Sequence, residues 1–428
     1  MNEITNNTVL RFMTCGSVDD GKSTVIGRLL FDTKTILTDT LSQIEKTSKK
    51  KGMTEVDLSL ITDGLQAERE QGITIDVAYR YFSTGNRKYI IADAPGHEQY
   101  TRNMVTAAST AQLAIILIDA RKGMLTQTKR HTYLAKLLGI KHVIVAVNKM
   151  DLIQYDEAQY KSICEDYKEF EKNILPLNTP ININFLPISA LKGDMIVNRG
   201  NSMAWHKGAT LLQLLEDLDT SDDIKDSSLR FPIQYICRPR ESANNELHDF
   251  RAFMGRIKSG LLKVNDKVKV LPSGYKSSIK EIRIGNQLIG EAIPEQSITV
   301  SLADEIDISR GDMLVHHNDS VGAIKSFTGM VCWFAEAPLS ANRTYLIMHT
   351  TQSSKAKITS INYKVNIQTL DSEDVNELKT NDIANISFKL AQPLIVDRYN
   401  ENRGTGAFII VDESTFHTVG AGMIQLLD

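Results

Sequence analysis

The chain has 428 residues, which is too long for one hydrophobic core and predicts two or three domains. Its apolar fraction is 42%, its charged fraction is 24% and its net charge is −3. This composition argues against a strongly basic nucleic-acid-binding protein, but it does not exclude a local basic patch. The 4 cysteines form no CxxC pair, which argues against a disulfide framework or a zinc site. The N-terminus lacks the features of a signal peptide, and the apolar run 113–118 is too short to span a bilayer. We therefore expect a cytoplasmic protein without a membrane partner.

A phosphate-binding loop is predicted between an apolar strand and an apolar helix near the N-terminus. It consists of Gly16, Ser17, Val18, Asp19, Asp20, Gly21, Lys22 and Ser23, followed by Thr24. Backbone N–H groups of such a loop and the positive end of the following helix attract phosphate, and this strand–loop–helix context is the one that the motif requires. We expect Lys22 to reach the outer phosphates and Ser23 to ligate Mg²⁺. The alternative for this loop alone is a chance glycine-rich turn.

Two later segments have the features of switches that respond to a γ-phosphate. In the first, Thr74 can offer its side-chain oxygen to Mg²⁺ and its N–H to the phosphate, although such a threonine more often only begins a strand. In the second, an apolar strand ends at Asp93, the expected Mg²⁺ partner, and Ala94, Pro95, Gly96 and His97 follow. We expect Gly96 to meet the γ-phosphate and His97 to orient the attacking water.

Two motifs indicate that the base is guanine. The segment Asn148, Lys149, Met150 and Asp151 follows a buried strand. A carboxylate such as that of Asp151 pairs with the N1–H and 2-amino groups of guanine, and adenine lacks both donors. Asn148 can brace the loop, and the stem of Lys149 can cover one face of the base. A later strand leads into Ser189, Ala190 and Leu191, where the Ala190 N–H can bond the guanine O6.

The strand and helix pattern predicts an α/β P-loop domain with a mostly parallel sheet over residues 1–225, with its site at the carboxyl ends of the strands. Short β-branched runs separated by turns then predict two antiparallel β-barrels over 229–318 and 325–428, with strands that include 231–237, 267–271, 344–349 and 407–412. This half has no second P-loop and no His-x-Gly-His run, so no separate chemistry is expected there. Asp397–Tyr399 and Asn402–Gly406 are equally consistent with a partner surface and an ordinary turn.

The motifs together resemble the translational GTPases, such as elongation factor Tu, with a G domain and two β-barrels. Several stretches resemble a narrower family, the large GTPase subunit of bacterial sulfate adenylyltransferase. They are Gly16–Lys22, His97–Met104, Asp304–Asp312, Ala335–Ser340 and Val419–Ile424.

This resemblance implies that the chain hydrolyses GTP with Mg²⁺ and binds a small subunit that carries the adenylyl-transfer site. Together the two subunits would make adenosine 5′-phosphosulfate and pyrophosphate from ATP and sulfate, the first step of sulfate assimilation. The resemblance also implies that Val18 and Ile73 flank the path of His97 to the water. The competing interpretations are an elongation-type GTPase that delivers aminoacyl-tRNA and a regulatory GTPase whose only output is partner binding.

Overall fold

The computed structural model describes residues 9–36, 38–50, 56–61, 76–96, 100–174, 181–219, 227–238, 250–341 and 343–427. The chain divides into two compact units, one of residues 1–220 and 366–371 and one of residues 221–365 and 372–428. Among the described residues, every helix is too short or too polar to span a bilayer.

The first unit is built on a 6-stranded sheet in the order β2-β3-β1-β4-β5-β6. Its strands are β1 (Val9–Gly16), β2 (Ala78–Ser83), β3 (Lys88–Asp93), β4 (Leu113–Asp119), β5 (His142–Asn148) and β6 (Asn182–Pro187). Neighbouring strands are parallel, except for β2, which runs antiparallel to β3 at the edge of the sheet. Every residue of β4 is buried, as expected for a continuous apolar run covered on both faces.

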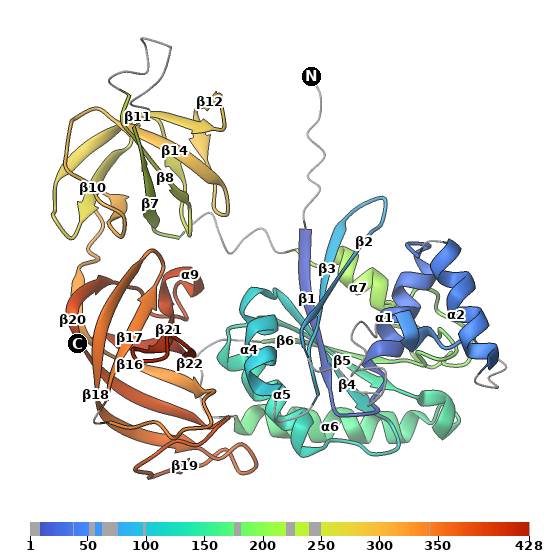
Figure 1. Cartoon of the computed structure of the whole chain (residues 1–428). Helices are drawn as coiled ribbons and strands as arrows, with labels where there is room; N and C mark the ends of the chain where they lie inside the picture. Colours follow the sequence, from blue (N-terminus) through green and yellow to red (C-terminus); the bar gives the residue numbers. More distant parts are fainter. Residues whose placement is uncertain are drawn as a thin grey trace. The chain divides into compact units, whose positions relative to one another are not determined.

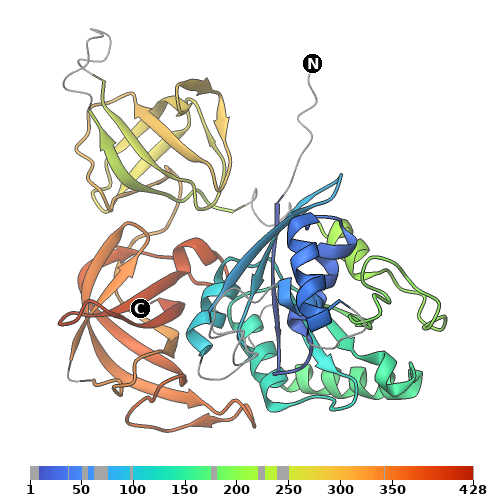
Figure 2. The same ribbon diagram turned by 45° about the vertical axis from the view of Figure 1, so that its right-hand side comes forward.

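Helices cover both faces of this sheet. In the described part of this unit the α-helices are α1 (Lys22–Asp32), α2 (Thr38–Lys50), α4 (Thr101–Thr110), α5 (Thr126–Leu137), α6 (Glu157–Asn173) and α7 (Leu211–Asp217), and η1 (Leu58–Ile61) and η3 (Met150–Ile153) are 3₁₀ turns. Helices α1 and α7 lie on one side of the sheet, and α4 and α5 lie on the other (Figures 1 and 2). This is the α/β arrangement that the sequence predicts.

The carboxyl ends of the parallel strands meet at one edge of the sheet. Thr14 of β1 pairs with Asp93 at the end of β3, and Asp119 at the end of β4 pairs with Asn148 at the end of β5. Because these strand ends lie side by side, motifs that are far apart in the sequence are gathered at one edge, where ligands of open α/β folds bind.

Two elements of the first unit differ from the sequence-based expectation. The polar, lysine-rich stretch around 46–52 has the composition of a solvated, mobile segment, but its first part belongs to helix α2. Ser48 explains part of its order, because it is buried and its hydroxyl accepts a hydrogen bond from the Asp57 N–H at 2.9 Å. Strand β2 was not anticipated, because its exposed positions include Tyr79 and Tyr81, so its sequence lacks the alternation of apolar and polar residues that predicts an edge strand.

The second unit consists of two antiparallel barrels. The strands of the first barrel follow the order β10-β15-β7-β8-β14-β11-β12, and a further β10–β11 pairing closes it. They are β7 (Phe231–Cys237), β8 (Ala252–Arg256), β10 (Lys267–Leu271), β11 (Lys276–Ile284), β12 (Gln287–Ile289), β14 (Ser297–Leu302) and β15 (Met313–His316), with a small added pair of β9 (Leu262–Lys263) and β13 (Glu291–Ala292).

The second barrel follows the order β17-β21-β22-β16-β20-β18-β19 and is closed by a β17–β18 pairing. Its elements are β16 (Ala323–Trp333), β17 (Thr344–His349), β18 (Gln352–Val365), β19 (Ser372–Glu373), β20 (Ile383–Ile395), the short helix α9 (Arg403–Gly406), β21 (Ala407–Asp412) and β22 (Thr418–Leu427). Each barrel has its own apolar core, centred on residues such as Phe231 and Val300 in the first and Phe327 and Phe388 in the second.

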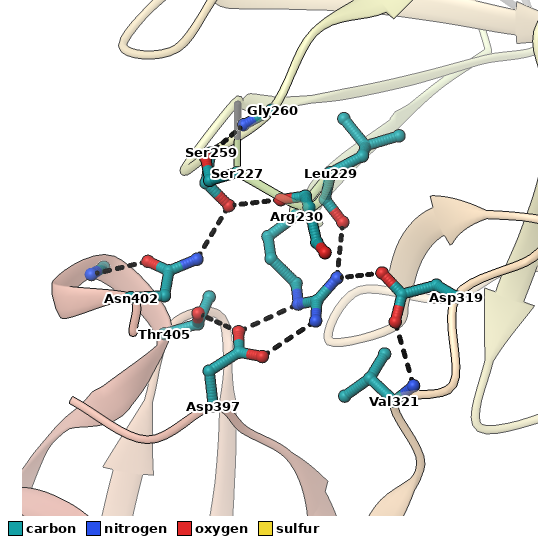
Figure 3. Close-up of polar contacts among 12 residues, drawn as sticks. Ser227, Leu229, Arg230, Ser259, Gly260, Asp319, Val321, Asp397, Asn402 and Thr405 are labelled. Atoms are coloured by element: carbon teal, nitrogen blue, oxygen red, sulfur yellow. Dashed lines mark hydrogen bonds and ion pairs between the residues drawn. The ribbon is translucent and has the colours of Figure 1, made fainter. Parts of the chain in front are cut away.

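A buried arginine joins the two barrels of the second unit (Figure 3). Arg230, just before β7, donates to both carboxylate oxygens of Asp397 and also to Asp319. The Thr405 hydroxyl donates to the same Asp397 carboxylate. Asp397 and Thr405 are therefore turned inward, so they serve this contact and are not part of an open partner surface.

Candidate nucleotide-binding site

The predicted phosphate loop connects the end of β1 to the first turn of α1. Gly21 caps the helix with a φ of 92°, a left-handed conformation that favours glycine. A Cβ atom at this position would lie only 2.4 Å from Nδ2 of Asn148, so the loop and the end of β5 are in close contact. The Asn148 Nδ2 group donates to the Asp20 carbonyl at 2.7 Å. The two predicted motifs are therefore joined directly.

Asp20 makes a hydrogen bond within the phosphate loop. Its carboxylate oxygen accepts a hydrogen bond from the Ser17 N–H at 2.5 Å, and its side chain is buried. Burial raises the pKa of the Asp20 carboxyl above its usual value, although the Ser17 N–H and the Lys22 ammonium act in the opposite direction. The loop is thus held by an internal contact.

Lys22 and Gly96 lie against each other on the phosphate side of the site. The Lys22 ammonium donates to the carbonyls of Gly16 at 3.0 Å and Ser17 at 3.2 Å. A Cβ atom at Gly96 would lie 2.8 Å from the Lys22 nitrogen and 2.5 Å from the Gly16 carbonyl oxygen. Position 96 therefore accommodates only glycine at this separation, and the segment after β3 packs directly on the phosphate loop.

Asp93 occupies the expected place at the end of β3. Its carboxylate is buried and accepts a hydrogen bond from the Thr14 hydroxyl at 3.1 Å. Ala94 and Pro95 lead from it to Gly96, and Ser23 lies in the first turn of α1. Oxygen ligands of this kind suit Mg²⁺. Within the described residues, no three His, Cys, Asp or Glu side chains gather into a metal site.

The predicted base-binding residues also lie together. The Ser189 hydroxyl donates to an oxygen of the Asp151 carboxylate at 2.7 Å. The Ala190 N–H donates to the side-chain oxygen of Asn148 at 3.0 Å. If the Ala190 N–H also donated to the guanine O6, this one donor would serve both O6 and the side-chain oxygen of Asn148. Asn148 thus contacts both the phosphate loop and the 189–191 segment.

The remaining predicted residues lie around these contacts or outside the described part of the chain. Val18 is half-buried and Asp19 is exposed at the tip of the phosphate loop, while Thr24 is half-buried on α1. Met150 is buried, and Leu191 is exposed. Ile73, Thr74 and His97 lie outside the described residues.

Sequence reasoning missed Asp119, which anchors Lys149. Asp119 is buried at the end of β4, and its carboxylate lies 3.0 Å from the Lys149 ammonium. The Lys149 ammonium also donates to the Asp19 carbonyl, and Arg121 donates to both Asp119 oxygens at 3.0 and 2.6 Å. Burial acts to raise the pKa of Asp119, but the bonds from Arg121 and Lys149 outweigh it and leave that pKa well below its usual range. A polar residue at the end of an apolar strand, the signal that identified Asp93, could have found it.

Comparison with known proteins identifies the family. The family model "Elongation factor Tu GTP binding domain" matches residues 7–221, and "GTP-eEF1A C-terminal domain-like" matches residues 326–425. "Sulfate adenylyltransferase subunit 1" of Psychromonas ingrahamii is 51% identical over 98% of this chain and 87% of its own length. The chain belongs to the sulfate adenylyltransferase subunit 1 family.

Other members of this family are similarly close. The proteins of the same name from Cellvibrio japonicus and Bacteroides fragilis are 50% and 48% identical, each over 97% of this chain and 86% of its own length. Among solved structures, sup35 complexed with GMPPNP aligns over 100% of this chain and 96% of that chain, with 20% identity and a TM-score of 0.43. The GTP-binding domain is assigned from the family model that matches residues 7–221.

Proposed function

We propose that this chain is the GTP-binding and GTP-hydrolysing subunit of a sulfate adenylyltransferase. The observation that carries the proposal is the 51% identity to sulfate adenylyltransferase subunit 1 over 98% of the chain. Because the similarity extends through both units, it favours this function over an elongation factor that delivers aminoacyl-tRNA.

The phosphate groups of GTP are proposed to bind between the loop of residues 16–23 and Gly96. Lys22 is well placed for this role, since its ammonium now contacts loop carbonyls and can exchange them for phosphate oxygens. The Gly96 N–H would meet the γ-phosphate, because position 96 packs directly on the loop.

Mg²⁺ is proposed to be held by oxygen atoms of Ser23, Thr74 and Asp93, the last of them through water. The buried Asp93 carboxylate at the end of β3 has the hard oxygen chemistry that this ion requires. When bound, the ion supplies positive charge that neutralises the β- and γ-phosphates. His97 is proposed to orient the water that attacks the γ-phosphate in line with its leaving oxygen.

Guanine is proposed to be selected by Asp151, which would accept hydrogen bonds from N1–H and the 2-amino group. Ser189 holds one oxygen of this carboxylate in place, so the side chain is oriented before the base arrives. An adenine base would leave the carboxylate without these donors, and an unpaired polar group is costly.

Adenylyl transfer is proposed to take place on a second, smaller subunit. There, a sulfate oxygen would attack the α-phosphorus of ATP, and the bond to pyrophosphate would break. Loss of the γ-phosphate at this chain would free Thr74 and Gly96, so that both switch segments relax and change their grip on the partner. GTP hydrolysis would thereby drive the formation of adenosine 5′-phosphosulfate.

Co-purification with the small subunit provides the test. GTP hydrolysis by the complex is measured with ATP plus sulfate and, as the control, with ATP plus chloride. The proposal predicts faster hydrolysis when both ATP and sulfate are present. Equal rates in the two conditions, with hydrolysis stimulated instead by aminoacyl-tRNA and ribosomes, would contradict it.

A further inference from the structure

Arg28 connects helix α1 to the predicted base-binding segment. Its Nε group donates to the Ala190 carbonyl at 3.1 Å, and its Nη2 group donates to the Leu191 carbonyl at 2.5 Å. The two carbonyls belong to consecutive residues, so one planar guanidinium holds two neighbouring peptide groups. A fork of this kind fixes both distance and orientation, which a single donor cannot do.

The same segment is held from its other side by Asn148. Ala190 donates its N–H to Asn148 and accepts from Arg28 through its carbonyl oxygen. Both holding groups are themselves tied to the phosphate end of the site. Asn148 donates to the Asp20 carbonyl in the phosphate loop, and Arg28 projects from the helix that this loop begins.

Helix α1 is therefore a rigid connection between the two ends of the nucleotide. Lys22 stands in its first turn and Arg28 stands six residues later, which places them about 9 Å apart along the helix axis. Asp32, one turn further on, lies 3.7 Å from the Arg28 guanidinium, and both side chains are largely buried. Arg28 and Lys22 are thus carried by one helix.

We infer that Arg28 is a positioning residue that sets the guanine selectivity of this site by fixing the 189–191 segment opposite the O6 of the base. Arg28 touches neither phosphate nor base in this arrangement, and it acts through the Ala190 and Leu191 peptide groups. The inference rests on the proposed assignment of residues 189–191 and Asp151 to the base. It adds a residue of α1 that the nucleotide-binding motifs do not include.

The chemistry of the base gives a direct readout. GDP carries O6 and N1–H, whereas 2-aminopurine riboside diphosphate lacks both and keeps the 2-amino group. The loss of N1–H at Asp151 is the same for every Arg28 variant, so a displaced peptide N–H narrows the difference between the two ligands without abolishing it. The ratio of their dissociation constants therefore measures the position of the segment, separately from phosphate binding.

The experiment measures both dissociation constants by calorimetry for the full chain and for Arg28→Met. We expect weaker GDP binding by about tenfold, the order of one hydrogen bond, with 2-aminopurine riboside diphosphate binding within twofold of the original. Arg28→Lys, which keeps the charge and loses the fork, is expected to show most of the same loss and serves if Arg28→Met does not fold.

The matched control is Asp32→Asn, which removes the ion pair but leaves the Arg28 bonds to the two carbonyls. It is expected to keep the original ratio. An unchanged ratio in folded Arg28→Met and Arg28→Lys, or an equal loss for both ligands, would overturn the inference. If Asp151→Asn also leaves the guanine preference unchanged, the assignment of the base site itself is wrong. If Asp151→Asn changes the preference but the Arg28 variants keep the original ratio, only the role of Arg28 is wrong.

Discussion

Arg230 and Asp397 form a two-pronged ion pair that joins the barrels of the second unit. The Nε and Nη2 groups of the arginine each lie 2.8 Å from a different oxygen of the Asp397 carboxylate. Its third nitrogen, Nη1, lies 2.6 Å from Asp319, in the segment between the barrels. One buried guanidinium therefore binds both carboxylates.

Arg230→Met is expected to destabilise the second unit strongly, because it leaves two buried carboxylates without their cation. Removing one partner of a buried ion pair typically costs about 3–5 kcal/mol. The measurement is urea unfolding followed by Trp333 fluorescence in a Trp205→Phe background, since the chain has 2 tryptophans and Trp333 is buried in the second barrel.

Arg283→Met provides the matched control for this measurement. Arg283 lies 2.9 Å from Glu281, but their side chains are 31% and 34% exposed. A pair this exposed is expected to contribute less than about 1 kcal/mol. Equal shifts for Arg230→Met and Arg283→Met would contradict the role assigned to the buried pair.

His131 on α5 is expected to make the first unit less stable in mild acid. The side chain is buried, and burial lowers its pKa from 6.5 to about 3, with the positive charges of Lys22 and Arg130 acting in the same direction. Below pH 6.5 the unfolded chain binds a proton that the folded chain excludes. The contribution of His131 to the free energy of unfolding is therefore fully present above pH 6.5. It falls by about 1.4 kcal/mol per pH unit as the pH is lowered towards 3.

His131→Phe removes this titration and keeps an aromatic ring. Urea unfolding followed by Trp205 fluorescence, in a Trp333→Phe background, is expected to show a shallower loss of stability between pH 6.5 and 4.5 for the variant. The control is His131→Phe in the Trp205→Phe background, where unfolding of the second unit followed by Trp333 should not change. An identical pH slope for His131→Phe and the original chain would show that His131 does not exclude a proton.

The fold could be predicted largely because its strands are apolar runs bounded by turns. The predicted strands 231–237, 267–271, 344–349 and 407–412 coincide with β7, β10, β17 and β21. The edge strand β2 lacks such a run, and it could not be recognised from periodicity alone. Helix α2 carries mostly polar residues, so only its tertiary contacts reveal it.

The nucleotide-binding motifs could be placed at strand ends from sequence, but the residues that support them could not all be identified. The brace expected from Asn148 is present, because its contacts follow from its place in a known motif. Asp119 and Arg28 belong to no such motif. The partner of Asp397 lies 167 residues away in the chain, and no local pattern indicates a contact at that separation.

Asp119→Asn is expected to weaken nucleotide binding, because Lys149 loses the carboxylate that holds its stem beside the base site. Charge-assisted hydrogen bonds are worth about 1.5–3 kcal/mol, which corresponds to roughly tenfold to a hundredfold in the dissociation constant of GDP. Arg121→Met, which removes the exposed partner of the same carboxylate and leaves Lys149 in place, should cost much less. Comparable losses in the two variants, measured by calorimetry, would contradict the anchoring role.

His97→Ala is expected to keep GTP binding and lose most of its hydrolysis. A group that orients the attacking water typically contributes about a hundredfold or more to the rate. Single-turnover hydrolysis of bound GTP isolates this step from nucleotide release. Glu98→Gln, at the neighbouring position, is the control and should retain the original rate. A His97→Ala variant that hydrolyses GTP at the original rate would remove His97 from the mechanism.

Asp151→Asn is expected to exchange the preference for guanine for a preference for xanthine. Xanthine presents a carbonyl where guanine has its 2-amino group, and the asparagine amide can donate to it. The affinity for GTP should fall while the affinity for xanthosine triphosphate rises, as competition binding would measure. Ser189→Ala, which frees the carboxylate without changing its chemistry, should weaken GTP and keep the guanine preference.

The most direct measurement of the central claim joins this change of base preference to the sulfate reaction. The complex of the small subunit with the Asp151→Asn chain is supplied with ATP and sulfate, and adenosine 5′-phosphosulfate is measured with either GTP or xanthosine triphosphate present. The account predicts that xanthosine triphosphate now raises product formation and that GTP no longer does at the concentration that serves the original complex. Stimulation that still follows GTP, or product formation indifferent to both nucleotides, would contradict the claim that this chain's nucleotide site drives the reaction.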